Sequence, residues 1–134
     1  MSILSIAVSG LSAASLRVSV AASNIANART TGPLPASGGS GTPAYVPLRV
    51  DQVTQSSGSM LGGTAATVSA VSPSFTAEFD PSAAFANQDG LVAAPNVDLA
   101  SEFAELTTAK YSFIASAKVI QAYAEMTDWL LETT

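Results

Sequence analysis

The side chains that could do chemistry in this 134-residue chain are chiefly carboxylates and hydroxyls, because it contains neither cysteine nor histidine. Asp80, Asp89 and Asp98 are spaced too widely for a calcium loop, which collects its ligands within about 12 residues. No serine stands in a pattern with a base that resembles a nucleophilic triad, and no pair of acids suits glycan cleavage. The sequence therefore predicts that the protein is not an enzyme.

The absent residue types and the low charge exclude further classes. Without cysteine and histidine the chain has no disulfide, no thiolate nucleophile and none of the usual zinc ligands. The Gly-Gly-Ser-Gly tract at residues 38–41 is not a phosphate loop, because no strand precedes it and no lysine follows. Charged residues make up 11% of the chain and the net charge is -5, so no basic stripe is available for nucleic acid. We expect no cofactor, no metal and no nucleic-acid partner.

The first element that could position functional residues is an N-terminal helix over residues 1–31. Its apolar residues recur at alternating intervals of three and four, which is a heptad seam typical of helices that pack on a partner: Leu4, Ala7, Leu11, Ala14, Val18, Ala21, Ile25 and Ala28. Serine, valine and isoleucine are mediocre helix formers, and Gly10 costs about 1 kcal/mol relative to alanine. This helix should therefore gain its stability from a partner helix.

The same N-terminal segment is neither a cleaved signal nor a membrane span by its sequence. No lysine or arginine precedes the apolar part, and serines interrupt it every few residues. No uninterrupted apolar run reaches the roughly 18 residues that a span needs. We expect export by a route without a cleaved signal, and no direct membrane insertion.

The middle of the chain predicts a flexible linker followed by a small β-rich region. Thr30 to Pro33 should end the first helix, and residues 32–44 are rich in glycine, proline and serine, as linkers are. Residues 45–94 hold three short strand candidates, Tyr45 to Val53, Ala66 to Val71 and Phe75 to Phe79. Turn residues dominate from Asp80 to Asn96, which predicts an ordered loop that leads into the last helix.

A second amphipathic helix is predicted within residues 95–134, capped by Asp98 or Ser101. Its seam is interrupted by Lys110 and Thr127 and otherwise consists of Leu99, Phe103, Leu106, Phe113, Ala117, Ile120, Ala124 and Leu131. Two long helices at opposite ends of a short chain most simply pair with each other in antiparallel fashion. The predicted fold is therefore mainly α, with terminal helices forming an antiparallel coiled-coil pair around a small β-rich insert.

Two sequence signatures near the ends of the chain resemble those of the bacterial flagellar rod and hook proteins. The first comprises Ser9-Gly10-Leu11, the tract Ala22 to Asn27, Thr30 and Gly32. The second comprises Asp89 to Val92, Pro95 to Asp98 and Glu102. Both occur in the family's order, and the chain length, the short middle and the Pro-Asn-Val-Asp tract are most similar to the proximal-rod type.

This resemblance implies a structural role. A rod subunit of this type would be exported unfolded by the flagellar type III apparatus, and it would polymerise through its terminal helices in the periplasmic part of the basal body to transmit torque. Its partners would be itself, other rod proteins, the export apparatus and the membrane-ring or adaptor proteins at the rod base. The residues predicted to form the assembly interface are Leu4, Leu11, Val18, Asn24, Ile25, Asn27, Thr30, Gly32, Pro95, Asn96, Val97, Phe103, Leu106, Phe113, Ile120 and Leu131.

Three other interpretations remain open at this stage, one of which is a small hydrolase that should show turnover as a purified monomer. The chain could be a different type III-secreted axial or filament protein, or a chaperone-binding export substrate, because such proteins share helical arms. The paired seams could also reflect no more than the core of an ordinary helical hairpin. Asn24 and Asn27 could likewise be plain polar positions, although their place in the signature favours hydrogen bonds between subunits.

Overall fold

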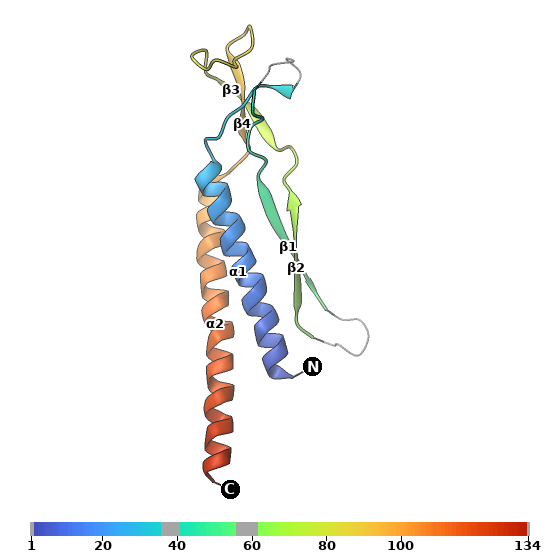
Figure 1. Ribbon diagram of the computed structural model, residues 1–134, viewed down its shortest axis with the longest axis vertical. Helices are drawn as coiled ribbons and strands as arrows, with labels where there is room; N and C mark the ends of the chain where they lie inside the picture. Colours follow the sequence, from blue (N-terminus) through green and yellow to red (C-terminus); the bar gives the residue numbers. More distant parts are fainter. Residues whose placement is uncertain (1, 36–40, 56–61, 134) are drawn as a thin grey trace. The chain divides into compact units, whose positions relative to one another are not determined.

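The computed structural model describes residues 2–35, 41–55 and 62–133 of the chain. Part of the predicted linker, residues 36–40, lies outside the described residues, so the predicted domain boundaries stay a prediction. Figure 1 shows a long helix at each end of the chain and strands between them. The elements in order are α1 (Ile3–Asn27), β1 (Leu48–Thr54), β2 (Thr64–Ala70), β3 (Phe75–Phe79), β4 (Leu91–Pro95) and α2 (Leu99–Glu132).

The strands form two separate two-stranded sheets, β1 with β2 and β3 with β4. The bounds predicted for β3 are confirmed, and those of β1 and β2 differ from the prediction by one to three residues. The loop predicted from Asp80 to Asn96 is wrong in its second half, because Leu91–Pro95 forms β4. The chain is thus a mixture of helix and strand with more strand than the sequence predicted.

Strand β4 owes its conformation to pairing on both sides. It runs antiparallel to β3 in a register that sets Phe75 opposite Pro95 and Phe79 opposite Leu91. On its other side, Gly32 and Ala93 exchange backbone hydrogen bonds of 3.0 and 2.8 Å. Val92, Ala93 and Ala94 are consequently buried. Because consecutive residues are buried, this segment lacks the alternation of buried and exposed residues that is typical of a strand with one face in water.

Helix α2 begins where the sequence predicts a cap. The Asp98 carboxylate accepts hydrogen bonds from the backbone N–H groups of Ala100, at 3.0 Å, and Ser101, at 3.4 Å. The Ser101 hydroxyl donates a third bond of 2.9 Å to the same carboxylate. These bonds, led by that of the Ser101 hydroxyl, lower the pKa of Asp98 because they stabilise its charged form. Asp98 rather than Ser101 is therefore the N-cap.

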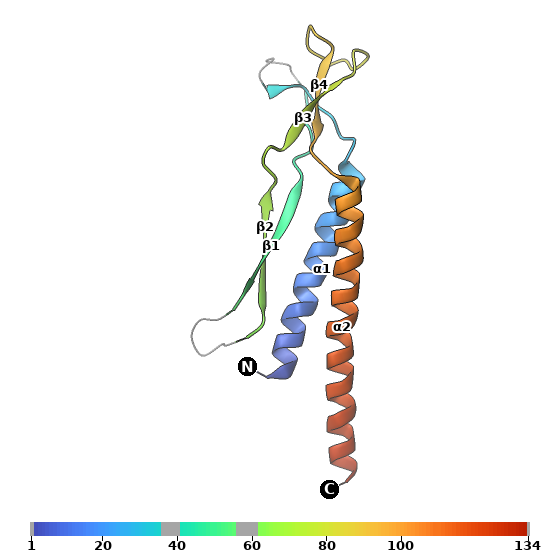
Figure 2. The same cartoon turned by 180° about the vertical axis from the view of Figure 1, so that it is seen from behind.

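The contacts divide the chain into two compact units, and both helices contribute to each. One unit comprises Met1–Ser19, Val50–Thr67 and Ala104–Thr134. In it α1 and α2 lie side by side, as Figures 1 and 2 agree. The hairpin of β1 and β2 also contacts α1, since the Thr64 N–H donates to Ser9 Oγ at 3.1 Å. Gly10 permits the close helix contact, because a Cβ there would lie 2.9 Å from Ser116 Oγ.

The second unit comprises Val20–Arg49 and Val68–Phe103. It holds the C-terminal end of α1, the first turn of α2, and the β3–β4 sheet. Its best-buried side chains include Val92, Asn24 and Pro47. One of these residues, Asn24, is polar, and a buried polar side chain is expected to have hydrogen-bond partners.

Candidate assembly interface

The seam predicted on α1 is the covered face of that helix. Leu4, Leu11, Val18 and Ile25 are half-buried, while the alanines that alternate with them at positions 7, 14 and 21 are buried. Alanine at every second seam position leaves little side chain between the backbones, so neighbouring segments approach closely. The α1 side chains predicted to form the assembly interface are thus already partly covered within one chain.

Asn24 is fully buried and uses its whole hydrogen-bonding capacity inside the chain. Its amide nitrogen donates to the Leu48 carbonyl and to Glu102 Oε1, both at 2.7 Å. Its Oδ1 accepts from the Tyr45 hydroxyl and from the Leu48 N–H, both at 3.0 Å. A side-chain amide offers two donors and two acceptor positions, so none is left for a neighbouring subunit in this conformation. Asn24 joins the end of α1 to the first turn of α2 and to the chain leading into β1.

Asn27 and Thr30 shape the end of α1. Asn27 Nδ2 donates to the Ser23 carbonyl at 2.9 Å, and Asn27 Oδ1 accepts from the Thr30 hydroxyl at 3.3 Å. The Thr30 carbonyl then accepts from the Tyr45 N–H at 3.0 Å. These bonds satisfy polar groups at a helix terminus, where intrahelical partners run out. Both residues therefore help to direct the chain from α1 toward Gly32.

Gly32 lies where two backbone segments meet. It pairs with Ala93 of β4, and a Cβ on it would lie only 2.3 Å from the backbone nitrogen of Ala44. Any larger residue would have to displace main chain rather than a side chain. The first signature therefore ends in a glycine because the fold leaves no room for a side chain.

The second signature connects β4 to α2. Pro95 is buried and closes β4, and Val97 is half-buried. Asn96 donates from its side chain to the Pro73 carbonyl at 2.9 Å, and from its backbone to the Ser74 carbonyl at 3.0 Å. In this order, the proline thus ends strand β4, the asparagine holds the connecting segment by hydrogen bonds, and the aspartate caps helix α2.

The predicted seam of α2 behaves differently from that of α1. Leu106 and Ile120 are half-buried, but Phe103, Phe113 and Leu131 are exposed, Leu131 by 77%. The best-covered face of α2 instead carries small and polar residues: Glu105, Ala109, Ser112 and Ser116. Ala109 is fully buried. Three large apolar side chains of the seam therefore keep part of their surface exposed in the single chain.

An ion pair joins the two helices beside this exposed seam. Arg17 binds Glu105 in a bidentate manner, through Nε to Oε1 and through Nη2 to Oε2 at 2.8 Å. The hydrogen bonds from Arg17 lower the pKa of Glu105, against the opposing effect of partial burial. Gly10 lies against Ser116 and Arg17 against Glu105, so the helices run in opposite directions where they touch.

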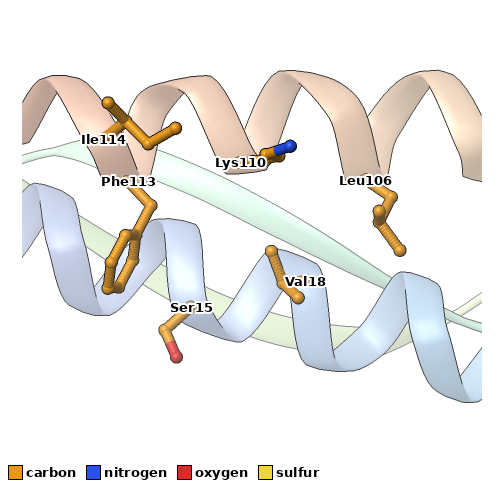
Figure 3. A pocket seen from close by; sticks show the side chains of 6 residues that line it. All are labelled: Ser15, Val18, Leu106, Lys110, Phe113 and Ile114. Carbon is orange, nitrogen blue, oxygen red and sulfur yellow. The ribbon is translucent and has the colours of Figure 1, made fainter.

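A cavity of about 420 Å³ lies between the helices next to this ion pair. We call it the groove. Figure 3 shows Phe113 and Leu106 extending from α2 toward the α1 residues Ser15 and Val18. Its lining is almost wholly apolar apart from one ammonium group and one hydroxyl, and consists of Ser15, Val18, Leu106, Lys110, Phe113 and Ile114. Three of these residues, Val18, Leu106 and Phe113, belong to the predicted interface.

Sequence reasoning missed several residues that organise these surfaces. Tyr45 and Glu102 were not expected to bind Asn24, and Arg17 was not expected to bind Glu105. Arg17 is the only charged residue before Arg29, so a lone cation in an apolar helix was the available signal for an acidic partner. No comparable signal identifies Tyr45, because its role depends on how the chain folds back onto α1.

Within residues 2–35, 41–55 and 62–133, no cluster of three or more aspartates or glutamates could hold a metal ion. In the same part of the chain, α1 alone is long and apolar enough to cross a membrane. Length and composition are weak support for a span, because a core helix or a signal sequence passes the same test. The absence of direct membrane insertion stays a prediction.

Comparison with known proteins matches both ends of the chain to one group. The family model described as "Flagella basal body rod protein" matches residues 4–33. The model described as "Flagellar basal body rod FlgEFG protein C-terminal" matches residues 88–132. The flagellar basal-body rod protein FlgC of Salmonella typhimurium is 33% identical over 129 residues, which cover 94% of this chain and 91% of the relative. The FlgC protein of Escherichia coli O6:H1 matches with the same identity and coverage.

Proposed function

This chain belongs to the flagellar basal-body rod protein family, and on that premise we propose that it is a structural subunit of the proximal rod. The relatives are structural proteins of the flagellum and not enzymes. The finer proposal is that the subunit is located in the periplasmic part of the basal body. There it joins copies of itself, other rod proteins and the proteins at the rod base.

The observation that carries this proposal is the 33% identity to FlgC across nearly the full length of both proteins. A match limited to the terminal helices would fit any axial protein of the flagellum, because both family models lie at the chain ends. Coverage of 91% of FlgC includes the short middle as well. The middle is the part in which a proximal-rod protein would differ from another axial component.

The exposed seam of α2 supports assembly through the terminal helices. Phe103, Phe113 and Leu131 expose large apolar surface in the single chain, and covering such surface releases roughly 25 cal/mol per Å². We propose that α1 and α2 form an antiparallel coiled-coil pair and that this seam then packs against sister subunits. The helices are marginal by composition, so contacts between subunits would stabilise them further.

The signature residues have an indirect part in this proposal. Asn24, Asn27, Thr30 and Gly32 make their bonds within the chain, as do Pro95 and Asn96. We propose that they hold the ends of α1 and α2 in the geometry that presents the seam. Export in an unfolded state through the type III apparatus, followed by folding on incorporation, fits a chain whose helices need neighbours.

The test is deletion of the gene followed by complementation. Loss of swimming and of the rod, restored by the wild-type gene, is the expected result. A density map of basal bodies isolated from the complemented strain should contain this chain in the rod. Normal rods in the deletion strain, or the chain found only in another axial structure or bound to a chaperone, would refute the proposal.

A further inference from the structure

The groove on one chain has a matching feature near the end of α2. Leu106, Lys110 and Phe113 of the groove follow an i, i+4, i+7 pattern in which an apolar residue, a cation and an aromatic residue face one side of the helix. Ala124, Asp128 and Leu131 repeat this spacing with an anion at the centre. We call these three residues the C-terminal stripe.

The two sets lie on the same side of α2, five helical turns apart. Each residue of the stripe follows its counterpart by 18 positions, and 18 residues correspond to five turns of about 3.6 residues. Lys110 and Asp128 therefore occupy equivalent places on the helix with opposite charge. Within the described part of the chain neither has an ion-pair partner.

The C-terminal stripe is uncovered in the single chain. The helices run in opposite directions and Gly10 lies against Ser116, so the start of α1, seven residues before Gly10, lies against a part of α2 that precedes Ala124. Figure 1 shows α2 continuing beyond the N-terminal end of α1. Ala124, Asp128 and Leu131 are all exposed. Acidic residues gather around them, since Glu125 and Glu132 flank the stripe on the same part of the helix. The stripe thus presents an apolar and negatively charged surface.

We propose that the groove of one subunit receives the C-terminal stripe of a second copy of this chain. In this arrangement Leu131 lies against Phe113 and Ser15, Ala124 lies against Leu106, and Asp128 pairs with Lys110. Charge complementarity selects this occupant: the groove displays an ammonium group, and the stripe is an apolar surface of matching spacing with a carboxylate opposite it.

The contact joins different surfaces of the two copies, so it is heterologous. Two copies with parallel α2 helices would be shifted by about 27 Å, given a rise of ~1.5 Å per residue. Repeating such a shift with a rotation generates an open polymer rather than a closed dimer. This inference rests on the proposed rod function, because a rod is built from subunits that all have the same orientation. The groove and the C-terminal stripe would be the two surfaces that join them.

Engineered cysteines test the contact directly, because the chain has none of its own. Full-length Ser15→Cys and Leu131→Cys proteins are purified, mixed and oxidised. A cross-linked dimer that forms only in the mixture is expected. The matched control replaces Leu131→Cys by Met126→Cys, an exposed position on a different face of α2, which should give no cross-link with Ser15→Cys.

Charge reversal tests the pair at the centre of the contact. Lys110→Glu and Asp128→Lys should each raise the protein concentration needed for half-maximal assembly roughly three- to tenfold. The double variant should restore that concentration to within about twofold of wild type, because it reverses both partners. Pelleting of polymer by ultracentrifugation measures this.

The possible failures are distinguishable. If wild-type chains assemble and complement motility but Ser15 and Leu131 do not cross-link, and the double reversal does not restore assembly, this inference is wrong while the rod function stands. If the chain does not associate with itself at any concentration, the inference is also wrong. Failure of the rod function itself would appear in the deletion strain, independently of these variants.

Discussion

Asn24 of α1 donates a hydrogen bond of 2.7 Å to the Glu102 carboxylate in the first turn of α2, so the two signatures of the chain meet in one partly buried contact. The same amide also forms hydrogen bonds with the backbone of Leu48, at the start of β1. A fully buried amide with all its partners inside the chain contributes to folding more directly than to contacts between subunits.

We expect Asn24→Ala to destabilise the full-length protein by about 3 kcal/mol, because it removes the partner of the half-buried Leu48 backbone groups and of Glu102, and the acceptor of the Tyr45 hydroxyl. Asn24→Asp should be at least as damaging at pH 7, since it sets a second carboxylate beside Glu102. Urea unfolding followed by circular dichroism measures both variants.

Asn27→Ala is the matched control for that prediction. Among the described residues, the Asn27 side chain bonds to Ser23 and Thr30, both near the end of α1, so its loss should cost about 1 kcal/mol. Equal effects of the two alanine variants on unfolding would contradict the structural role of Asn24. Replacing both asparagines should reduce swimming, and unchanged swimming would argue that neither matters for the rod.

The pH dependence of stability should depend in part on Glu105. Its pKa is lowered from the ordinary 4.5 by Arg17, so its contribution is fully present above about pH 4.5 and is lost as the pH falls through the lower, folded-state value. The side chain is 40% exposed, so water screens the pair and the loss is about 1 kcal/mol or less.

Glu105→Gln should therefore lower stability at pH 7 and lose less stability than wild type between pH 7 and pH 3. Some acid sensitivity should persist, because the pKa of Asp98 is also lowered. Urea midpoints at the two pH values give the comparison. Asp128→Asn, at an exposed position without an ion pair in the described chain, is the matched control for the loss of one surface carboxylate. A wild-type slope in Glu105→Gln would refute the assignment.

The sequence predicted the helices and strands that are specified by patterns of neighbouring residues. Heptad spacing located both helices, and the alternation in Phe75–Phe79 located β3. Strand β4 was missed because Leu91–Pro95 has no alternation: it is paired with β3 on one side and with Gly32 on the other, and it is buried from Val92 onward. Such pairing is a property of the folded chain and leaves no periodic pattern.

The candidate interface was predictable to a similar degree. The α2 seam follows from its spacing, but the exposure of its residues Phe103, Phe113 and Leu131 does not. Small residues such as Ala109 and Ser116 pack against α1 because they allow close approach, and the larger residues are displaced to the surface. Hydrophobicity alone would have assigned the opposite arrangement. The role of Asn24 between subunits stays a prediction, and its partners within the chain, which are distant in sequence, leave no local signal.

Two glycines of the first signature should respond differently to alanine. In Gly32→Ala the new Cβ would meet the backbone of Ala44 at 2.3 Å, so the pairing with Ala93 must break and the loss should exceed about 3 kcal/mol. In Gly10→Ala the Cβ meets the Ser116 hydroxyl at 2.9 Å, which a side-chain rotation can relieve. Helix propensity adds about 1 kcal/mol in favour of alanine there, so the net change should be small.

Thermal unfolding of the two glycine variants measures this difference. The combination of Gly10→Ala with Ser116→Ala serves as a control, because it removes the atom that the new methyl group approaches. If Gly10→Ala proved as damaging as Gly32→Ala and the added Ser116→Ala did not relieve it, side-chain crowding would not explain the glycine at position 10.

Leu131→Asp should separate assembly from folding. The side chain is 77% exposed, so its replacement should change the stability of the single chain by less than about 0.5 kcal/mol. In the assembled rod the same position would be covered, and a carboxylate buried against an apolar neighbour without a partner is strongly unfavourable. Swimming should therefore be lost while the protein remains folded and is still exported. Met126→Asp, exposed by 51% on another face of the helix, should retain swimming. Normal motility in Leu131→Asp would show that this end of α2 stays exposed in the rod, because no buried site would tolerate the added charge.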